Sequence, residues 1–546
     1  MPTVYVDGKE VEIAATDRLN SIQAAAKAGV EIPHYCWHAG LTVVASCRMC
    51  LVEVGKKDQA TGKVAMQPKL VPACQTPAGP DTVIVTDSPK VKAAREMVEE
   101  DLLLRHPVDC SICDKAGECS LQDYHFEHGR DERRADIKPF HSRKRSLGDT
   151  VTLFVDRCVM CTRCVRFTRE ISGTSELMIA NRGAHEEIDV FRDINGEIQF
   201  PLDNKMSGNV VDLCPVGALG DKDFLYKQRV WFMKSHAGVC AGCSAGCNIR
   251  IDENQDHIYR LKPRENQAVN QWWMCDEGRY GWKHVHDEGR LTELKAKVGG
   301  DYKTIEWQQF VKEIPAKLQS AGKLAAVISP HLTVEEAYLQ ATLIRSLDPQ
   351  AVLALGFVPV AGEDEKFKNG FTIRAEKCPN KRGVEKVIAG LGGPTMTFDE
   401  VADAAAAGKF GGVWISGGYK GNWIDEATAA KFAGVSLLVV QDLFASPLSA
   451  LASYLLPGAA FPERDGSYVN VADRLQSFRW AIRPPAGVKV EGQLLWQLTG
   501  RPGLFQSTAV LADISREITA FASAASGVPE MGLDLKAQLL AETAAT

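Results

Sequence analysis

The first ninety residues alternate between short apolar runs and turn residues, a pattern that predicts a small α+β domain. Residues 3–13 alternate around Asp7-Gly8, a favoured two-residue turn, and predict a β-hairpin. An alanine-rich segment at 20–28 predicts a helix. Residues 50–54 and 82–86 predict two more strands. The order strand, strand, helix, strand is typical of a β-grasp domain.

The pattern is less regular in the middle of the chain. Residues 89–105 predict a helix, whereas 106–145 are polar and predict irregular structure. A strand is expected at 151–155. We expect residues 150–225 to form one compact unit and 236–285 to form another.

After about residue 290, apolar runs and helical patterns alternate. Strands are predicted at 324–328, 412–416 and 436–440, and helices at 333–345, 398–407 and 425–432. Continuous apolar strands separated by helices predict a parallel sheet with helical crossovers. The tail from about residue 509 is alanine-rich and is expected to be helical or poorly ordered.

Charge and hydropathy exclude two classes of function. The net charge of −6 over 546 residues offers no basic face for a nucleic-acid partner. No apolar run approaches the ~20 residues that span a bilayer, and the best candidate, 435–440, is short. The first residues alternate like a strand and carry no secretory signal pattern. We therefore expect a cytosolic protein whose membrane association comes through partners.

The distribution of cysteines points to metal chemistry. Of 16 cysteines, all but one lie between Cys36 and Cys275, and the exception is Cys378. Disulfides suit exported proteins, whereas clustered thiols in a cytosolic chain are more often metal ligands. Cys378 is expected to be a small buried hydrophobic residue.

The first two groups of candidate ligands are compatible with several metal centres. The first group, with the spacing C-x10-C-x2-C-x23-C, is Cys36, Cys47, Cys50 and Cys74. Four thiolates suit a binuclear or tetranuclear iron–sulfur cluster or a zinc ion. The second group is His106, Cys110, Cys113 and Cys119. A lone histidine is usually only hydrogen-bonded, but three grouped cysteines favour a ligand here, for a cluster or for zinc.

The third and fourth groups differ in how strongly they indicate a cluster. The third is Cys158, Cys161, Cys164 and Cys214, of which the last precedes Pro215. Its C-x2-C-x2-C triplet with a remote C-P is half of the bacterial ferredoxin pattern and is rare in zinc sites. The fourth is Cys240, Cys243, Cys247 and Cys275, for which zinc is a fair competitor. Fifteen cysteines and His106 together make four sets of four ligands.

These groups, in order and spacing, resemble the large iron–sulfur subunit of bacterial respiratory complex I, the G-type subunit of NADH:quinone oxidoreductase. The segment from Leu104 to Gln122 around the second group is the most specific. The resemblance implies one 2Fe-2S cluster at the first group and a 4Fe-4S cluster at each of the other three. Similar N-terminal modules occur in iron-only hydrogenases and NAD-linked formate dehydrogenases.

The C-terminal half resembles molybdopterin oxidoreductases. The similar segments are 441–444, 452–457, 462–470 and 473–476. The domain is nevertheless about half the catalytic length, and no cysteine beside a histidine follows Cys275. The loop after Gly417-Gly418 is also short. We therefore expect a shortened domain without molybdopterin.

We expect five domains in a multidomain α+β and α/β fold. They are a binuclear 2Fe-2S β-grasp domain at 1–88, a helical 4Fe-4S domain with one histidine and three cysteine ligands at 89–148, a ferredoxin-like 4Fe-4S domain at 149–232, a 4Fe-4S domain of molybdopterin-oxidoreductase type at 233–288, and a shortened molybdopterin-oxidoreductase-like α/β domain at 289–546.

The resemblance implies an electron relay without a catalytic site of its own. Its partners would be a flavin- and NADH-binding subunit with a small 2Fe-2S partner, then ferredoxin-like and quinone-site subunits, on the cytoplasmic side of the bacterial inner membrane. The groups of Cys36, Cys158 and Cys110 would form the wire. No G-x-G-x-x-G follows a strand, so no NADH site is expected in this chain. The alternatives are the electron-input subunit of an NAD-linked hydrogenase, a formate dehydrogenase and a zinc-rich scaffold.

Overall fold

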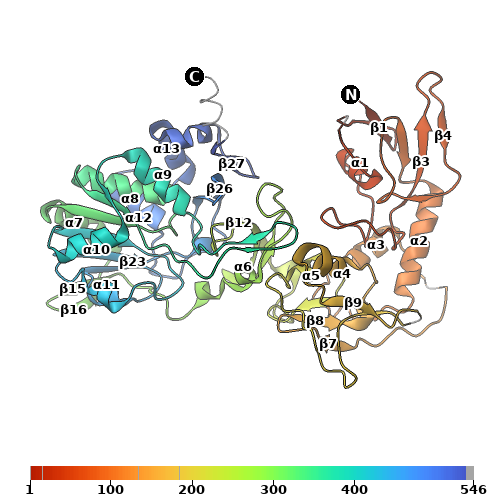
Figure 1. Ribbon diagram of the computed structural model, residues 1–546, viewed down its shortest axis with the longest axis horizontal. Coiled ribbons are helices and arrows are strands. Elements are labelled where there is room, and N and C mark those ends of the chain that lie inside the picture. The colour runs from red at the N-terminus through yellow and green to blue at the C-terminus, as the bar shows by residue number, and fades with distance from the viewer. Residues whose placement is uncertain (1, 15, 133, 184, 537–546) are drawn as a thin grey trace. The chain divides into compact units, whose positions relative to one another are not determined.

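The computed structural model describes residues 2–14, 16–132, 134–183 and 185–536 (Figure 1). The chain divides into two compact units. Unit 1 comprises Met1–Met233 and Phe367–Gly370, and unit 2 comprises Lys234–Lys366 and Phe371–Thr546.

Unit 1 begins with the predicted β-grasp domain. Its elements are β1 (Thr3–Val6), β2 (Lys9–Glu12), α1 (Ser21–Lys27), β3 (Leu51–Lys57), β4 (Val64–Met66), β5 (Val71–Pro72) and β6 (Thr82–Val85). The sheet order is β2-β1-β6-β3-β4, with β1 and β6 parallel. Asp7 and Gly8 both have positive φ, as the predicted hairpin turn requires. Asn20 caps α1 and receives a hydrogen bond from the Gln23 amide.

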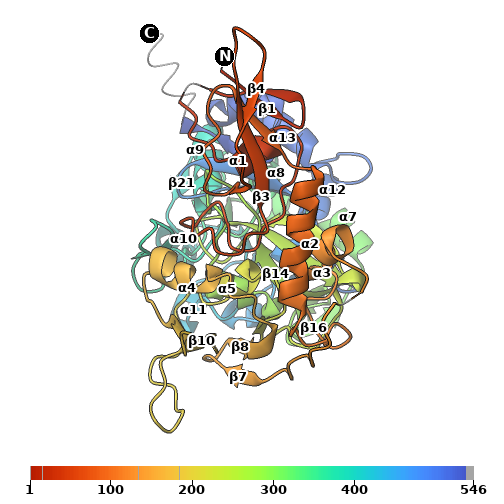
Figure 2. The same ribbon diagram turned by 90° about the vertical axis from the view of Figure 1, so that its right-hand side faces the viewer.

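Two helices follow and lie side by side (Figure 2). The predicted helix is α2 (Pro89–Leu103), and the second is α3 (Ser120–His128). The latter falls in the segment expected to be irregular, so that part of the prediction was wrong. Only Leu121 of α3 is buried, and its other positions carry no apolar stripe that could have revealed it. Packing instead holds it in place, because the Tyr124 ring lies 5.3 Å from that of Tyr35.

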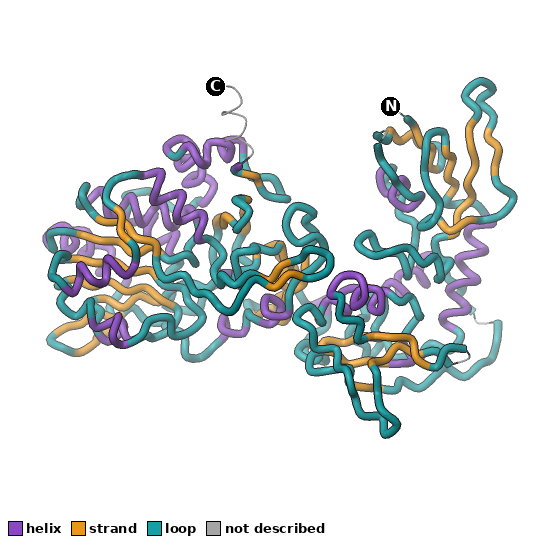
Figure 3. The backbone as a smooth tube through the Cα atoms, in the orientation of Figure 1, coloured by secondary structure: helices purple, strands orange, loops and turns teal. Residues whose placement is uncertain are grey.

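The rest of unit 1 consists of small sheets and short helices. Its elements are β7 (Lys144–Ser146), β8 (Val151–Phe154), η1 (Val155–Arg157), α4 (Arg163–Phe167), η2 (Thr168–Ser172), β9 (Leu177–Ala180), β10 (Glu187–Val190), α5 (Asn209–Leu213), β11 (Leu219–Asp221) and η3 (Val230–Phe232). Strands β11, β8 and β7 form one antiparallel sheet, and β9 and β10 form a hairpin. The segment η2 is a π-helical turn that continues α4. Long loops join these elements (Figure 3).

Unit 2 opens with an antiparallel sheet and ends with a small one. The opening elements are β12 (Lys234–Val239), β13 (Asn248–Asn254), β14 (His257–Pro263), α6 (Asp276–Tyr280) and η4 (Lys283–His286). The closing sheet contains β25 (Gly466–Val469), β26 (Arg474–Phe478) and β27 (Leu533–Asp534). A two-stranded ribbon is formed by β19 (Glu365–Lys366) and β20 (Thr372–Ile373).

The main sheet of unit 2 has eight strands in the order β16-β15-β24-β23-β22-β17-β18-β21. They are β15 (Lys295–Val298), β16 (Asp301–Thr304), β17 (Leu324–Ile328), β18 (Val352–Leu355), β21 (Thr395–Met396), β22 (Gly412–Ser416), β23 (Leu437–Asp442) and β24 (Tyr454–Pro457). The strands from β24 to β21 are parallel, as predicted, whereas β15 and β16 form an antiparallel edge.

Helices cover both faces of this sheet. They are α7 (Trp307–Ser320), α8 (Val334–Leu347), α9 (Lys381–Leu391), α10 (Phe398–Ala406), α11 (Glu426–Ala430), α12 (Glu491–Leu498) and α13 (Ser507–Glu517), with short turns η5 (Pro447–Ala450), η6 (Phe461–Glu463) and η7 (Thr519–Ser526). Successive residues of β17 enter different cores: Ala326 joins the one with α8, and Val327 joins the one with α10. The predicted fold class is confirmed.

The alanine-rich tail is helical in its first part, where α13 and η7 lie, as expected. The end of that tail, 537–546, lies outside the described residues. No helix among the described residues has the length and apolar character to cross a membrane.

Candidate iron–sulfur sites

The first group lies in the loop between α1 and β3, completed by Cys74 after β5. Its thiols are in mutual contact, since Cys36 hydrogen-bonds with Cys47 and Cys74, and Cys74 also with Cys50. Hydrogen bonds from Cys47 and Cys74 hold the pKa of Cys36 far below its usual range, whereas the bond with Cys36 raises the pKa of Cys47. Thiols in such close contact can all ionise only with a bound cation to offset their mutual repulsion.

The second group lies around one cavity just before α3. The lining includes His106, Cys110, Cys113 and Cys119, all four predicted ligands. Burial lowers the pKa of His106 to about 4, so its imidazole is neutral at pH 7 and has a lone pair to offer. Gly217 also lines this cavity, and a Cβ built on it would lie 2.1 Å from the Cys113 Sγ. The sequence pattern did not reveal this glycine, although Cys214-Pro-Val-Gly217 ends on it.

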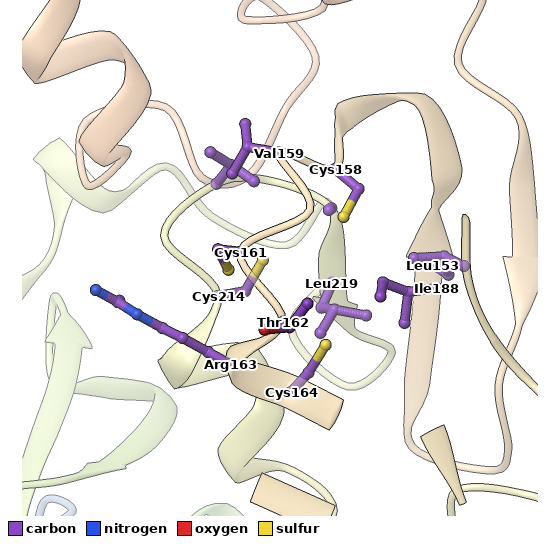
Figure 4. A pocket seen from close by; sticks show the side chains of 12 residues that line it. Leu153, Cys158, Val159, Cys161, Thr162, Arg163, Cys164, Ile188, Cys214 and Leu219 are labelled. Carbon is purple, nitrogen blue, oxygen red and sulfur yellow. The ribbon is translucent and has the colours of Figure 1, made fainter. Parts of the chain in front are cut away.

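The third group lies around one cavity (Figure 4). Its sulfur atoms turn toward this space from Cys158, Cys161, Cys164 and Cys214. Met160 and Thr162 adopt positive φ of 48° and 60°, which turns the backbone within each two-residue gap. Leu153, Ile188 and Leu219 complete an apolar lining. Burial raises the pKa of Cys161 to about 11, which disfavours a thiolate without a metal partner.

The fourth group lies in unit 2 around one cavity. It is lined by Cys240, Cys243, Cys247 and Cys275. The Gly242 amide points at the Cys240 Sγ across 3.4 Å, and the Gly278 amide points at the Cys275 Sγ across 3.3 Å. Such donors stabilise charge on sulfur. Gly278 was not singled out from the sequence, yet a Cβ on it would lie 3.1 Å from the Cys240 Sγ.

The shapes of these sites bear on what they can hold. All sixteen cysteines are free thiols, and Cys378, outside the four groups, is fully buried. In three groups all four ligands line one pocket. These donor sets, four thiols or three thiols with one imidazole, fit an iron–sulfur cluster with thiolate ligands.

Sequence models of five known families match consecutive parts of the chain. They are a 2Fe-2S iron-sulfur cluster binding domain at residues 1–89, an NADH-ubiquinone oxidoreductase-G iron-sulfur binding region at 95–134, an NADH-quinone oxidoreductase subunit 3 ferredoxin-like domain at 148–220, a molybdopterin oxidoreductase Fe4S4 domain at 233–287, and a molybdopterin oxidoreductase domain at 365–500. The chain therefore carries both 2Fe-2S and 4Fe-4S binding domains.

Curated relatives match about two thirds of the chain. The G subunit of NADH-quinone oxidoreductase from Rickettsia prowazekii is 37% identical over 354 residues, which are 64% of this chain and 49% of the relative. The NADH-ubiquinone oxidoreductase 75 kDa subunit of Reclinomonas americana is 36% identical over 67% of this chain and 51% of its own length. The chain spans about half the length of these relatives.

A solved structure was also found. An NAD+-reducing [NiFe]-hydrogenase in the H2-reduced state is 25% identical, with a TM-score of 0.33, and the match covers 42% of this chain and 91% of that one. The family assignment depends instead on the sequence matches, which place the G-type iron–sulfur binding region over the second ligand group. The chain belongs to the G-subunit family of NADH-quinone oxidoreductase, which comprises the large iron–sulfur subunits of complex I.

Proposed function

We propose that this chain relays electrons within an NADH:quinone oxidoreductase, from a flavin subunit toward the quinone-site subunits. The single observation that carries the proposal is that the third ligand group of unit 1 is linked to both the first and the second. Each link is a set of direct contacts.

The first link joins the first and third groups. Arg163 follows Cys161 by two residues and donates from Nη2 to the carbonyl of Trp37, across 2.6 Å. Trp37 is the neighbour of the ligand Cys36. Arg163 also donates from Nη1 to the carbonyl of Leu213, across 3.2 Å, next to Cys214. The two groups are therefore separated by one side chain and its hydrogen bonds.

The second link joins the third and second groups. It is the short segment that starts at the ligand Cys214. The amide of Ser120, beside Cys119, donates to the carbonyl of Pro215 across 2.9 Å. Two residues further along the chain, Gly217 lies so close to Cys113 that a Cβ on it would not fit. A few covalent bonds and one hydrogen bond thus separate these two ligand sets.

We infer one 2Fe-2S cluster on the first group and one 4Fe-4S cluster on each of the others, ligated by the sixteen residues named above. Such clusters take up and release single electrons. The chain's own residues hold the ligands, exclude water and set the surrounding charge. No catalytic residue is assigned to this chain.

Contacts in the C-terminal domain support the proposal that the relay uses iron–sulfur clusters and no molybdopterin. The carboxylate of Asp442, at the end of β23, accepts hydrogen bonds from the Gly418 amide at 2.8 Å and the Trp423 Nε1 at 2.6 Å. A Cβ on Gly417 would lie 2.2 Å from the Asp442 carboxyl carbon. The turn beyond β22, where open α/β sheets bind ligands, is therefore filled by the chain's own carboxylate. We propose that this domain binds no molybdopterin.

The proposed partners follow from the same relay. They are a flavin- and NADH-binding subunit with a small 2Fe-2S protein, then ferredoxin-like and quinone-site subunits, with a membrane arm reached through them. We propose a peripheral position on the cytoplasmic side of the bacterial inner membrane, and no nucleic-acid partner.

The proposal is tested on the intact assembly purified anaerobically from the native host. Full loading of the four groups corresponds to about 14 irons in this chain. We expect reduction by NADH to produce electron paramagnetic resonance (EPR) signals from this chain, and quinone to remove them. Stoichiometric zinc in the chain with little iron would overturn the proposal. Hydrogen-dependent reduction of the signals, with a hydrogenase subunit in the assembly, would support the alternative of an NAD-linked hydrogenase.

A further inference from the structure

One face of a single helix reaches the loop of the first group. Helix α4 and its π-helical continuation η2 carry Arg163, Arg166 and Glu170, spaced three and four residues apart. Residues with that spacing lie on the same side of a helix. Because α4 begins between the ligands Cys161 and Cys164, this face is attached rigidly to the third group.

Arg166 contacts ligands of both groups. Its side chain is 1% exposed. Its Nη2 donates to the carbonyl of Cys36, a ligand of the first group, and across 3.2 Å to the carbonyl of Cys161, a ligand of the third. Its Nη1 donates to the carbonyl of Thr42. One guanidinium therefore joins two ligand backbones that are 125 positions apart in the sequence.

Glu170 fixes the same loop from the next turn. Its carboxylate accepts the Thr42 amide at 2.9 Å and the Thr42 hydroxyl at 2.6 Å. Thr42 lies midway between the ligands Cys36 and Cys47. The π-helical turn brings Glu170 to this point, and such turns often occur at functional sites. Arg166 and Glu170 therefore both hold the loop at Thr42, and Arg166 also holds it at Cys36.

The charge of Arg166 acts on both groups at once. A guanidinium is always protonated in proteins, so burial leaves a positive charge between the two ligand sets. In a medium of low dielectric constant, that charge stabilises an electron added to either side. Net charge and hydrogen bonding are the levers by which a protein sets the potential of an iron–sulfur group.

We propose that Arg166 is a positioning residue that fixes the first and third groups relative to each other and raises the reduction potential of both. The inference rests on the proposed function, since both groups must hold clusters. When one electron passes between them, the first group is oxidised by one electron and the third is reduced by the same electron. No bond forms or breaks, and no proton is required.

The test compares three variants in the intact, cluster-loaded assembly. Arg166→Met removes the charge and the donors at similar length. Arg166→Lys keeps the charge but not the planar fork that reaches three carbonyls. Arg169→Met is the matched control, because Arg169 is exposed on the same helical segment and pairs only weakly with Glu170 at 3.1 Å. Midpoint potentials of both groups are measured by EPR-monitored redox titration.

We expect Arg166→Met to lower both potentials and to shift each one-electron equilibrium about tenfold, which corresponds to about 59 mV. The magnetic interaction between the two reduced groups should weaken as well. Arg166→Lys should keep potentials near those of the unaltered protein but weaken the interaction. Arg169→Met should change neither. A purely structural role would not move both potentials in one direction.

Two outcomes overturn the inference: potentials that Arg166→Met leaves unchanged, or a shift confined to one group. If the assembly with Arg166→Met cannot be isolated, the potentials are measured in Arg166→Gln instead. Glutamine keeps two N–H donors but carries no charge, so the inference requires that this variant lower both potentials. Failure of the proposed function looks different, because the unaltered protein would then lack the iron–sulfur signals before any variant is made.

Discussion

His106 is the one predicted ligand without a thiol. A neutral imidazole leaves its cluster one negative charge less than an all-cysteine site, which raises the reduction potential. We therefore expect His106→Cys to keep a cluster at the second group but to lower its midpoint potential, as measured by EPR-monitored titration. His141→Ala, at an exposed position, is the control. If His106→Ala and His106→Cys both leave the spectrum and potential unchanged, His106 is not a ligand.

Gly217 offers a second test at the scale of one atom. The Cβ of an alanine there would lie 2.1 Å from the Cys113 Sγ and 3.3 Å from the Lys115 Cβ. We expect Gly217→Ala to displace Cys113 and to remove the second cluster, a loss of about four irons per chain. Iron analysis and EPR should show the first and third groups intact. Gly79→Ala, where a Cβ meets nothing within 4 Å, should keep full iron content, and the same result for Gly217→Ala would contradict the argument.

Ligand residues could be predicted from the sequence where their chemistry requires a characteristic spacing along the chain. The cysteine groups met that condition, and three of them surround cavities with all four members in the lining. Gly217 and Arg166 could not be found this way, because each acts on a ligand distant in sequence. A glycine or an arginine carries no local pattern that distinguishes such a contact from an ordinary loop or surface position.

At the scale of elements, Asp442 at the end of β23 links stability to pH. Burial raises its pKa to about 6, against 3.8 for an ordinary aspartate, despite four hydrogen-bond donors. The folded chain therefore binds the proton more tightly than the unfolded chain, and stability falls as pH rises through 6. Between pH 5 and pH 7 the loss is about 1 kcal/mol.

We expect this loss to disappear in Asp442→Asn, which has no carboxyl group to titrate. The measurement is the free energy of local opening of β22 and β23, taken from hydrogen exchange in the full chain at pH 5 and pH 7. Asp425→Asn, at an exposed carboxylate that caps α11, is the control. If the free energy of local opening depends on pH in Asp442→Asn as it does in the unaltered protein, other groups cause that dependence.

Element prediction succeeded where burial imposes a pattern. Strands β17 and β22 match the predicted bounds, because five consecutive apolar or small residues are buried on both faces of a sheet. Helix α10 begins at the predicted Phe398, where Thr397 and Glu400 form a capping box. Helix α3 was missed because a polar helix with one buried residue has no periodic signal.

At the scale of the whole molecule, the order of the ligand groups could not be read from the residue pattern. The chain presents the groups as first, second, third and fourth, whereas contacts in unit 1 link the third group to both the first and the second. The link from Arg163 to Trp37 spans 126 positions. Only the resemblance to a known family implied this electron-transfer path, since long-range packing decides which loops meet.

The fourth group provides the last prediction. It lies in unit 2, whereas the other three groups lie in unit 1, and we propose that the C-terminal domain holds no cofactor to receive an electron. We therefore expect its role to be structural, because a cluster would tie Cys275 to the loop of Cys240, Cys243 and Cys247, 27 intervening residues upstream.

The substitution Cys275→Ser distinguishes a structural role of the fourth group from a role in electron transfer. Cys275 caps α6, and its Sγ accepts the Gly278 amide; serine is also a good cap, so the substitution removes mainly the cluster ligand. We expect a lower yield of intact assembly, while the NADH-to-quinone rate per bound flavin is largely kept. Cys378→Ser, at a buried cysteine outside the four groups, should keep the iron content. A normal yield with collapsed turnover would instead place the fourth group on the electron path.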